Sequence, residues 1–290
     1  MDILLFNPNA GSVENLGLTA DQLLAKLQER GVYATIPPGE INEDVVRDAL
    51  GSGARIIAAG GDGTIHNLLK TAAGCGFPNM GIIPLGTANH LAVALSIPND
   101  IDTAIDIIAA GHTRRIDLGR VNGTVFTQAA GAGLHARIFH DYGERKEKKP
   151  LDATAAAARA LAGFQPRLMR VVLDGQPYIG ELTQVTAANT PAYGRSFVIA
   201  PDARIDDGLL DVVLVHSLTK VEILAYAQAA MQGRLSEMKK TYVTRAQKVE
   251  VYSVEAEAVE IHADAQPVGH TPAVIEVIPH CIEVTAPEVR

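Results

Sequence analysis

The stretch "IIAAGGDGTIHNLL", residues 56–69, places three glycines around one aspartate, after an apolar run and before a segment with helical spacing. The apolar run predicts a buried strand over 55–61, and the residues that follow predict a helix over 64–74. Glycines at a strand-to-helix junction let backbone N–H groups come close to an anion, and phosphate is the common one. The stretch therefore predicts a phosphate-binding turn in an α/β fold.

Strands and helices alternate on both sides of this turn. We expect strands over 2–6, 32–36, 55–61 and 80–86, and helices over 18–31, 43–53, 64–74, 87–96 and 100–111. The expected strands are continuously apolar and the connections are short, which is typical of a parallel sheet covered by helices on both faces.

The pattern changes after residue 114. Alternating polar and apolar residues follow, with hairpin signals at Asn122-Gly123 and Asp174-Gly175, and helical patterns return only over 151–164 and 220–233. We therefore predict an α/β domain over 1–114 and a β-rich domain over 115–290. The last strand, near 281–285, could return to the first domain, and the sequence alone does not decide this.

Composition limits the partners of the chain. Its 290 residues carry a net charge of -8, which argues against nucleic acid because binding a polyanion needs a basic face. The exception is the basic run "RKEKK" at 145–149, which could touch an anionic membrane surface. Two cysteines are too few for a disulfide framework, and we expect neither a signal peptide nor a membrane span, because no apolar run is long enough. We therefore expect a cytoplasmic protein.

Three loops are expected to meet at one edge of the first domain's sheet. "NPNAGS" (7–12), "GGDGT" (60–64) and "PLGTAN" (84–89) each follow a predicted strand, and ligands of open α/β sheets bind at the carboxyl ends of the strands. Asp62 cannot itself bind phosphate, but a Mg²⁺ ion between the two would explain its place. The competing interpretation is a tight turn whose aspartate caps the next helix.

A second glycine motif offers a different interpretation. "GAGLHA" at 131–136 matches the loose G-x-G-x-x-A form of the dinucleotide fingerprint, and Asp152 lies about 20 residues further on. The motif falls where the strand–helix alternation has stopped, so we expect a close-packed glycine turn instead. A dinucleotide-dependent oxidoreductase is the least favoured function.

The ordered set of motifs resembles one known family. "NPNAG", "GGDGTIHNLL", "PLGTANHLA", "IDLGRVNG", "GAGLHA", "APDARIDDGLLDV" and "HTPAVIEVIP" occur in the order found in the diacylglycerol kinase catalytic-domain family, which includes bacterial lipid kinases and sphingosine kinases and is related to NAD kinases and phosphofructokinases. The resemblance spans nearly the whole chain. It implies an NAD kinase-like α/β nucleotide domain followed by a β-sandwich-like domain, with a function in phospholipid metabolism.

The resemblance also implies site residues, cofactors and partners. The cofactors would be ATP and Mg²⁺, and the acceptor would be the hydroxyl of a membrane lipid, diacylglycerol-like or sphingoid, reached by peripheral contact at the inner membrane face. Residues expected around ATP are Asn7, Pro8, Asn9, Ala10, Gly11, Thr35, Gly60, Gly61, Asp62, Gly63, Thr64, Ile65, His66, Gly86, Thr87 and Asn89.

Carboxylates take the remaining roles that the resemblance implies. Asp62 and Asp117 would organise the catalytic Mg²⁺, and Asp264 would take the proton from the lipid hydroxyl. A second, structural Mg²⁺ would be held by Asp207 with main-chain oxygens of Arg204 and Leu209.

Two departures from the family pattern leave alternatives open. His90 stands where the family has an aspartate, and Gln266 stands where it has a glutamate. The loss of two acidic groups should weaken Mg²⁺ binding, because imidazole is a poor ligand for a hard cation. The chain could therefore be a kinase for a soluble acceptor such as NAD, or a nucleotide- or lipid-binding regulator without turnover. The acceptor and the oligomeric state, a homodimer included, stay open.

Overall fold

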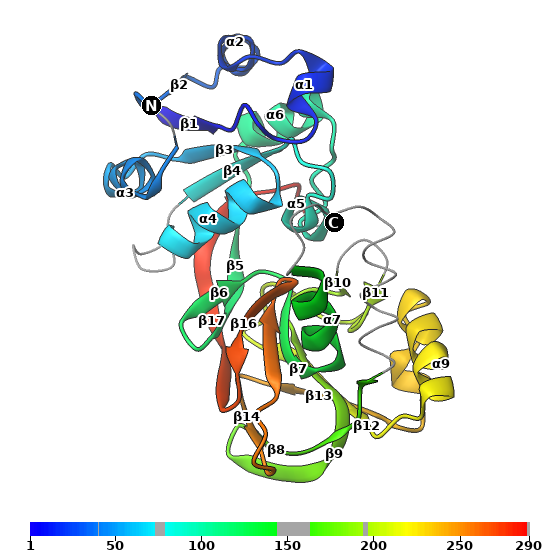
Figure 1. Cartoon of the computed structure of the whole chain (residues 1–290). Coiled ribbons are helices and arrows are strands. Elements are labelled where there is room, and N and C mark those ends of the chain that lie inside the picture. The colour runs from blue at the N-terminus through cyan, green and yellow to red at the C-terminus, as the bar shows by residue number, and fades with distance from the viewer. Residues whose placement is uncertain (40, 73–78, 144–162, 194–196, 289–290) are drawn as a thin grey trace. The chain divides into compact units, whose positions relative to one another are not determined.

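The computed structural model describes all residues except 40, 73–78, 144–162, 194–196 and 289–290 (Figure 1). The chain divides into two compact units, Met1–Asp117 with Pro279–Arg290, and Leu118–Ile278. The boundary that we predicted after residue 114 lies three residues before this division. Cys75, the basic run at 145–149 and all but the end of the helix predicted over 151–164 fall outside the described residues.

The first unit is built on a parallel sheet, as predicted. Its strands are β1 (Asp2–Phe6), β2 (Ala34–Thr35), β3 (Ile56–Gly60) and β4 (Asn79–Pro84), in the order β2-β1-β3-β4. The end of the last strand, β17 (Ala273–Thr285), pairs in parallel with β4 through Glu283 and Val284. All four neighbouring pairs are parallel, so the carboxyl ends of β1, β3 and β4 share one edge.

Helices cover both faces of this sheet (Figure 1). They are α1 (Val13–Leu16), α2 (Ala20–Glu29), α3 (Glu43–Gly51), α4 (Asp62–Ala72), α5 (His90–Ala94) and α6 (Ile101–Ala110). Helices α2 and α6 pack together on one face, where Leu23, Leu27, Ile105 and Ile108 bury against apolar residues of the strands. Helices α3 and α4 contact each other on the other face.

Most boundaries in this unit shift by one to three residues from the prediction, and three of these shifts concern the candidate site or its neighbours. Helix α4 begins at Asp62 and not at Thr64, so the aspartate belongs to its first turn. Helix α5 begins at His90 and not at residue 87, because Asn89 takes a left-handed conformation with φ 53° that ends the preceding loop. The strand predicted over 32–36 is reduced to Ala34–Thr35.

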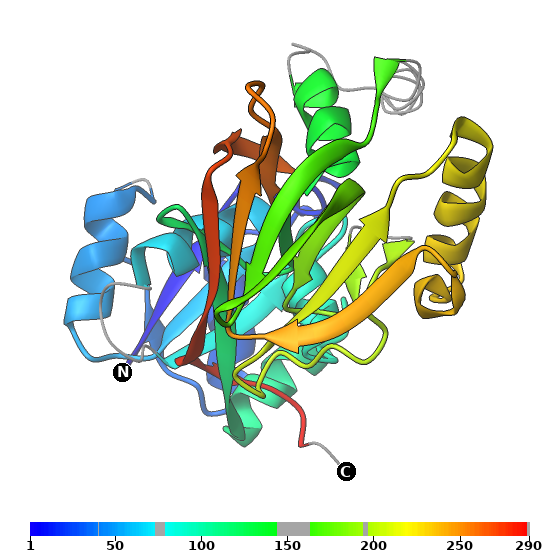
Figure 2. The same cartoon turned by 90° about the horizontal axis from the view of Figure 1, so that it is seen from below.

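The second unit is antiparallel and rich in strands (Figure 2). Its strands are β5 (Thr113–Val121), β6 (Thr124–Phe126), β7 (Ala129–Gly133), β8 (Arg167–Leu173), β9 (Gln176–Ala188), β10 (Ala192–Tyr193), β11 (Phe197–Val198), β12 (Leu210–His216), β13 (Thr241–Ala246), β14 (Lys248–Ser253), β15 (Glu260–Ala263), β16 (Gln266–His270) and the start of β17. Their main order is β16-β15-β7-β9-β8-β14-β17, and β12 pairs with β9 and β13. β5 and β17 each contribute residues to both units.

Both predicted hairpin turns are confirmed. Asn122 and Gly123 join β5 to β6, and Asp174 and Gly175 join β8 to β9, each as a two-residue loop with positive φ at both positions. Positive φ at both central residues matches the twist of the flanking strands.

Among the described residues, the helices of this unit are α7 (Leu134–Gly143) and α9 (Lys220–Met231), with a short 3₁₀ turn at Leu235–Glu237. Helix α9 confirms the helix predicted over 220–233. Helix α7 was not predicted, because a close-packed glycine turn was expected where it begins. The "GAGLHA" motif covers the end of β7 and the start of α7. Because β7 pairs antiparallel with β9 and β15, the motif lacks the parallel βαβ setting that a dinucleotide fingerprint requires.

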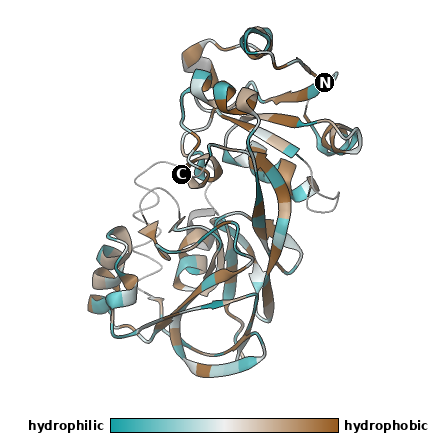
Figure 3. Cartoon of the chain, turned by 180° about the vertical axis from the view of Figure 1, so that it is seen from behind, coloured by the Kyte–Doolittle hydropathy of each residue, from teal (hydrophilic) through white to brown (hydrophobic). Residues whose placement is uncertain are grey.

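Apolar residues follow the strands of both units, and the helices mix polar and apolar positions (Figure 3). In the second unit the strands enclose one buried cluster that includes Phe126, Met169 and Ile261, while α7, α9 and neighbouring loops build another around Leu134, Ile223 and Tyr226. The α7 and α9 cluster also contains a polar contact, in which the Tyr226 hydroxyl lies 3.1 Å from His135 Nε2.

Burial of this histidine predicts a pH-dependent stability. Burial lowers the pKa of His135 to about 4, so the folded chain keeps the ring neutral at a pH where the unfolded chain protonates it. Stability is then complete above the unfolded pKa of about 6.5 and is lost as the pH falls towards 4, by about 2 kcal/mol at pH 5. Urea unfolding at pH 7 and pH 5 measures this loss.

In the His135→Gln variant, we expect the loss between pH 7 and pH 5 to be smaller by about 2 kcal/mol, because the titrating ring is gone. His112→Gln is the matched control, since His112 is exposed. An equal loss in His135→Gln and the unmodified chain would contradict the interpretation.

Candidate nucleotide site

The three predicted loops meet at the carboxyl edge of the parallel sheet, which confirms the convergence. The Asn7 side chain donates from Nδ2 to Thr64 Oγ1 at 2.8 Å, and this contact joins the loop after β1 to the start of α4. Ser12 donates to the Leu85 carbonyl oxygen at 2.7 Å, which joins the loop after β1 to the loop after β4. The loops are therefore held to one another by side-chain hydrogen bonds.

Glycines let these loops approach closely. A Cβ atom on Gly61 would lie 3.0 Å from the Cα of Gly86, and a Cβ on Gly60 would lie 2.6 Å from the Thr64 side chain. A Cβ on Gly11 would lie 2.9 Å from Thr87 Oγ1. Side chains at these positions would push the loops apart, so the glycines serve packing between loops as well as access to a ligand.

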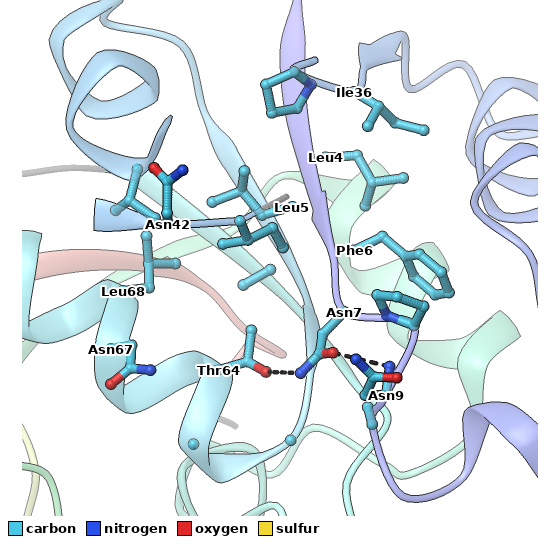
Figure 4. A pocket seen from close by; sticks show the side chains of 18 of the residues that line it. Leu4, Leu5, Phe6, Asn7, Asn9, Ile36, Asn42, Thr64, Asn67 and Leu68 are labelled. Carbon is cyan, nitrogen blue, oxygen red and sulfur yellow. Dashed lines mark hydrogen bonds between the residues drawn. The ribbon is translucent and has the colours of Figure 1, made fainter. Parts of the chain in front are cut away.

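A pocket of about 1060 Å³ opens beside the loops within the first unit (Figure 4). This volume is at the upper end of the range for small-molecule and cofactor sites. Seven of the residues predicted around ATP line it: Asn7, Pro8, Asn9, Ala10, Gly61, Gly63 and Thr64.

The other residues predicted around ATP lie outside this lining. They are Gly11, Thr35, Gly60, Asp62, Ile65, His66, Gly86, Thr87 and Asn89. Thr35 is exposed on β2 and is followed by Ile36, which does line the pocket. Ile65 is 5% exposed and buries its side chain in the core, so it could reach a ligand only through its backbone.

Sequence reasoning missed the half of the pocket away from the loops. This half is lined by apolar Ile36, Pro37, Ile41, Val46 and Leu68 and by polar Asn42, Asn67, Lys70 and Thr71. Asn42 caps α3, with its Oδ1 accepting the Val45 N–H at 3.0 Å, and Asn67 is exposed on α4. The residues come from separate elements and share no motif, so the sequence carried no signal for them.

Asp62 holds the loop after β4 by its carboxylate. One oxygen accepts the Asn89 N–H at 3.0 Å, and the other accepts the His90 N–H at 2.6 Å. The His90 ring also lies close, with Nδ1 3.3 Å from Asp62 Oδ1. Burial raises the pKa of Asp62, but the His90 ring and these amide donors together lower it by more, so the carboxyl stays ionised. Asp62 therefore caps α5, not the helix in which it lies.

Asp117 has a similar histidine neighbour. Its side chain is fully buried, and Oδ1 accepts the His280 N–H at 2.6 Å while the His280 ring Nδ1 lies 3.4 Å away. Both carboxylates assigned to the catalytic Mg²⁺ are thus engaged by a histidine. Within the described ranges, no three His, Cys, Asp or Glu residues come close enough together to hold a metal ion. Asp62, whose side chain is 39% exposed, remains able to hold Mg²⁺ through water.

The loop predicted to bind a structural Mg²⁺ fits a cation better. Asp207 Oδ1 accepts the Leu209 N–H at 3.1 Å, which places the carboxylate against the backbone of the same turn. Asp211 is 4% exposed, and its Oδ2 has no hydrogen-bond partner among the described residues. Burial raises the pKa of Asp211, as do the nearby Asp207 and Asp202 charges, despite the opposing effect of Arg245. A bound cation would relieve this crowding of negative charge.

Asp264 has a structural role in the second unit. It begins a two-residue turn between β15 and β16, with φ 42° at Asp264 and 63° at Ala265. Its carboxylate accepts the Thr127 N–H at 2.7 Å, the Thr127 hydroxyl at 2.9 Å, the Gln128 N–H at 2.8 Å and the Ala129 N–H at 3.2 Å. The role of Asp264 as a base stays a prediction, and Gln266 is exposed on β16.

Gly61→Ala is expected to damage the site without unfolding the chain. Its new Cβ would lie 3.0 Å from Gly86 Cα, which is backbone and can move only by shifting the loop. We expect nucleotide affinity, measured by calorimetry, to fall about tenfold or more. Gly51→Ala is the control, because its Cβ meets nothing within 4 Å. Equal affinity of the two variants would show that the loop spacing does not matter.

The Asp207 loop gives a metal-binding prediction that does not depend on activity. At about 100 times its Kd, Mg²⁺ should stabilise the chain by about 2.7 kcal/mol, a rise in Tm of about 5 °C or more. Asp207→Asn should abolish the rise because it removes the predicted ligand, and Asp44→Asn, at an exposed carboxylate of α3, should keep it. A Tm insensitive to Mg²⁺, or an unchanged response in Asp207→Asn, would contradict the assignment.

Comparisons with known proteins agree with this geometry. Residues 3–121 match the model of the diacylglycerol kinase catalytic domain, and residues 129–286 match that of the YegS C-terminal NAD kinase beta sandwich-like domain. The two matches together span nearly the whole chain. The chain belongs to the diacylglycerol kinase family.

Curated relatives carry the same name. A diacylglycerol kinase of Bacillus subtilis is 30% identical over 93% of this chain and 90% of its own length. A diacylglycerol kinase of Staphylococcus saprophyticus is 27% identical over 98% of this chain and 94% of its own length. These names support a lipid kinase family.

Solved structures show the same fold. A putative diacylglycerol kinase from Bacillus anthracis matches with a TM-score of 0.76 at 23% identity, over 98% of this chain and 94% of that one. A yeast NADH kinase in complex with NADH matches with a TM-score of 0.53 at 12% identity, over 99% of this chain and 83% of that one. The NAD kinase-like fold with a β-sandwich-like second domain is therefore confirmed.

Proposed function

We propose that this chain is an ATP- and Mg²⁺-dependent kinase that transfers the γ-phosphate to a lipid hydroxyl, diacylglycerol-like or sphingoid. The observation that carries the proposal is the meeting of three hydrogen-bonded loops beside a pocket of about 1060 Å³ at the carboxyl edge of a parallel sheet. The names of the relatives supply the acceptor class.

The pocket suggests how ATP would lie. Small residues and backbone N–H groups at Gly61 and Gly63 would face the phosphates, because such groups donate to anions. The base would lie in the opposite half, between apolar side chains such as Ile36 and Leu68, where the amides of Asn42 and Asn67 offer hydrogen bonds. Thr64, fixed by Asn7, stands between the two halves.

Residues of the chain would then position the reacting groups. Mg²⁺, when bound, would neutralise the phosphate charge that develops during transfer. Asp62 would hold this ion through water while it fixes the loop after β4, and Asp117 would add negative charge from its buried place. The lipid hydroxyl would lose its proton to Asp264, which has to release at least one of its hydrogen-bond donors to accept it.

The same site supports a second candidate, a nucleotide- or lipid-binding regulator without turnover. The histidines beside Asp62 and Asp117 favour it, because each occupies oxygens that a metal or its water shell would need. ATP binding without transfer to any acceptor would support this candidate.

The partners of the proposed enzyme follow from its substrate. In the described part of the chain, helices are too short or too polar to cross a membrane. We propose a cytoplasmic enzyme that reaches its lipid by peripheral contact with the inner face of the membrane.

The first test is a transfer assay with purified protein, labelled ATP, Mg²⁺ and mixed micelles of diacylglycerol, monoacylglycerol, sphingosine or ceramide, with NAD as a soluble acceptor. We expect label in one lipid. Asp62→Asn should lower kcat about a hundredfold or more, because it removes a charge and an acceptor from the site.

Asp44→Asn is the matched control, since Asp44 is exposed on α3. Label in NAD alone would shift the acceptor to a soluble metabolite. ATP binding without label in any acceptor would overturn the kinase and leave the regulator.

A further inference from the structure

Helix α9 of the second unit has an unusual outer face. On a helix at the surface of a water-soluble domain, the outward side chains are ordinarily polar. Here the exposed residues are Lys220, Val221, Leu224, Ala225, Gln228 and Met231, and four of the six are apolar. Val221 is 77% exposed, Leu224 67% and Met231 61%.

The helix itself is firmly anchored, so this exposure does not come from a frayed end. Thr219 and Glu222 form a reciprocal capping box, and Lys240 donates to Glu222 at 2.8 Å. On the inner face, Ile223 and Tyr226 are buried against the unit's core. The outer face is thus held in place as an apolar surface, and Figures 1 and 2 show α9 along the margin of the strand layer.

The charges around this face favour a negatively charged partner. Residues 217–244, which contain α9, the following 3₁₀ turn and most of β13, carry four Lys or Arg residues and two Glu residues. This segment is therefore positive within a chain whose net charge is -8. Exposed apolar side chains next to a positively charged segment can insert into a bilayer while the basic residues attract anionic headgroups.

The size of the face argues against a second copy of the chain as its occupant. A helix of 12 residues is about 18 Å long and about 10 Å wide, which gives a footprint of roughly 200 Å². A stable protein–protein interface buries about 800 Å² on each partner. A bilayer has no such requirement, because a few inserted side chains and basic neighbours add up along one surface.

We propose that the outer face of α9 is a membrane-docking surface, on which Val221, Leu224 and Met231 insert into the interface of an anionic lipid bilayer. The proposal rests on the proposed function, since a lipid acceptor resides in such a bilayer, and it names the surface by which the chain reaches it. Lys220, Arg234, Lys239 and Lys240 lie in the basic segment that would contact the headgroups, and of these Arg234 is paired with Glu237 and Lys240 with Glu222.

Vesicle sedimentation tests the surface directly. The unmodified chain should bind vesicles of phosphatidylcholine with added phosphatidylglycerol, bind pure phosphatidylcholine more weakly, and lose affinity as salt is raised. Leu224→Glu should lower the partition coefficient about tenfold or more, because it replaces an inserted apolar side chain by an anion. Ile179→Glu, at a 60% exposed residue of β9, is the matched control and should bind as the unmodified chain does.

A second measurement separates docking from chemistry. Leu224→Glu should keep the activity of the unmodified chain on a short-chain diacylglycerol dissolved as monomers, and lose activity on the same headgroup in vesicles. Failure of every variant to phosphorylate any acceptor would count against the proposed function alone, because vesicle binding is measured without turnover.

Three results would overturn the docking surface. One is an unmodified chain that does not bind anionic vesicles. Another is equal binding by Leu224→Glu and the unmodified chain, with equal thermal melts. The third is a dimer in analytical ultracentrifugation that Leu224→Glu dissociates, which would assign the face to a second copy of the chain.

Discussion

The carboxylate of Asp62 makes the contact on which the loops of the candidate nucleotide site depend. It lies in the first turn of α4, yet both of its oxygens accept N–H groups from Asn89 and His90, at the start of α5. Two loops that follow different strands are thereby fixed to each other, and glycines at 61 and 86 let them touch. This contact is charged on one side and made of backbone on the other, which makes it stronger than a hydrogen bond between neutral groups.

Much of the fold was predictable because local chemistry and tertiary structure agree. Continuous apolar runs gave the parallel strands, which are buried on both faces. Asn122-Gly123 and Asp174-Gly175 gave the hairpins, because few residues other than Asn, Asp and Gly adopt positive φ readily. The meeting of the loops at the carboxyl edge was predictable from the parallel sheet, because neighbouring parallel strands end at the same edge.

The rest depended on contacts between distant residues. Ala265 takes a φ of 63°, which alanine adopts at a cost, so the residue at this position does not itself favour the turn, although Asp264 and Pro267 are residue types that do. Four donors from residues 127–129 hold the Asp264 carboxylate and stabilise the turn, so the motif aspartate serves the fold as well as any chemistry. Asn42 and Asn67 look like ordinary helix residues in sequence, and they face the pocket only because α3 and α4 pack side by side.

The return of the chain to its first unit constrains the order of folding during synthesis. The second unit is continuous in sequence, from Leu118 to Ile278, and can complete its sheet as soon as it has left the ribosome. The first unit leaves the ribosome earlier, but β4 obtains its neighbour only when Glu283 and Val284 arrive. Until then β4 presents an open strand edge, a site where nascent chains can pair wrongly. The unit that carries the candidate nucleotide site is thus made first and finished last.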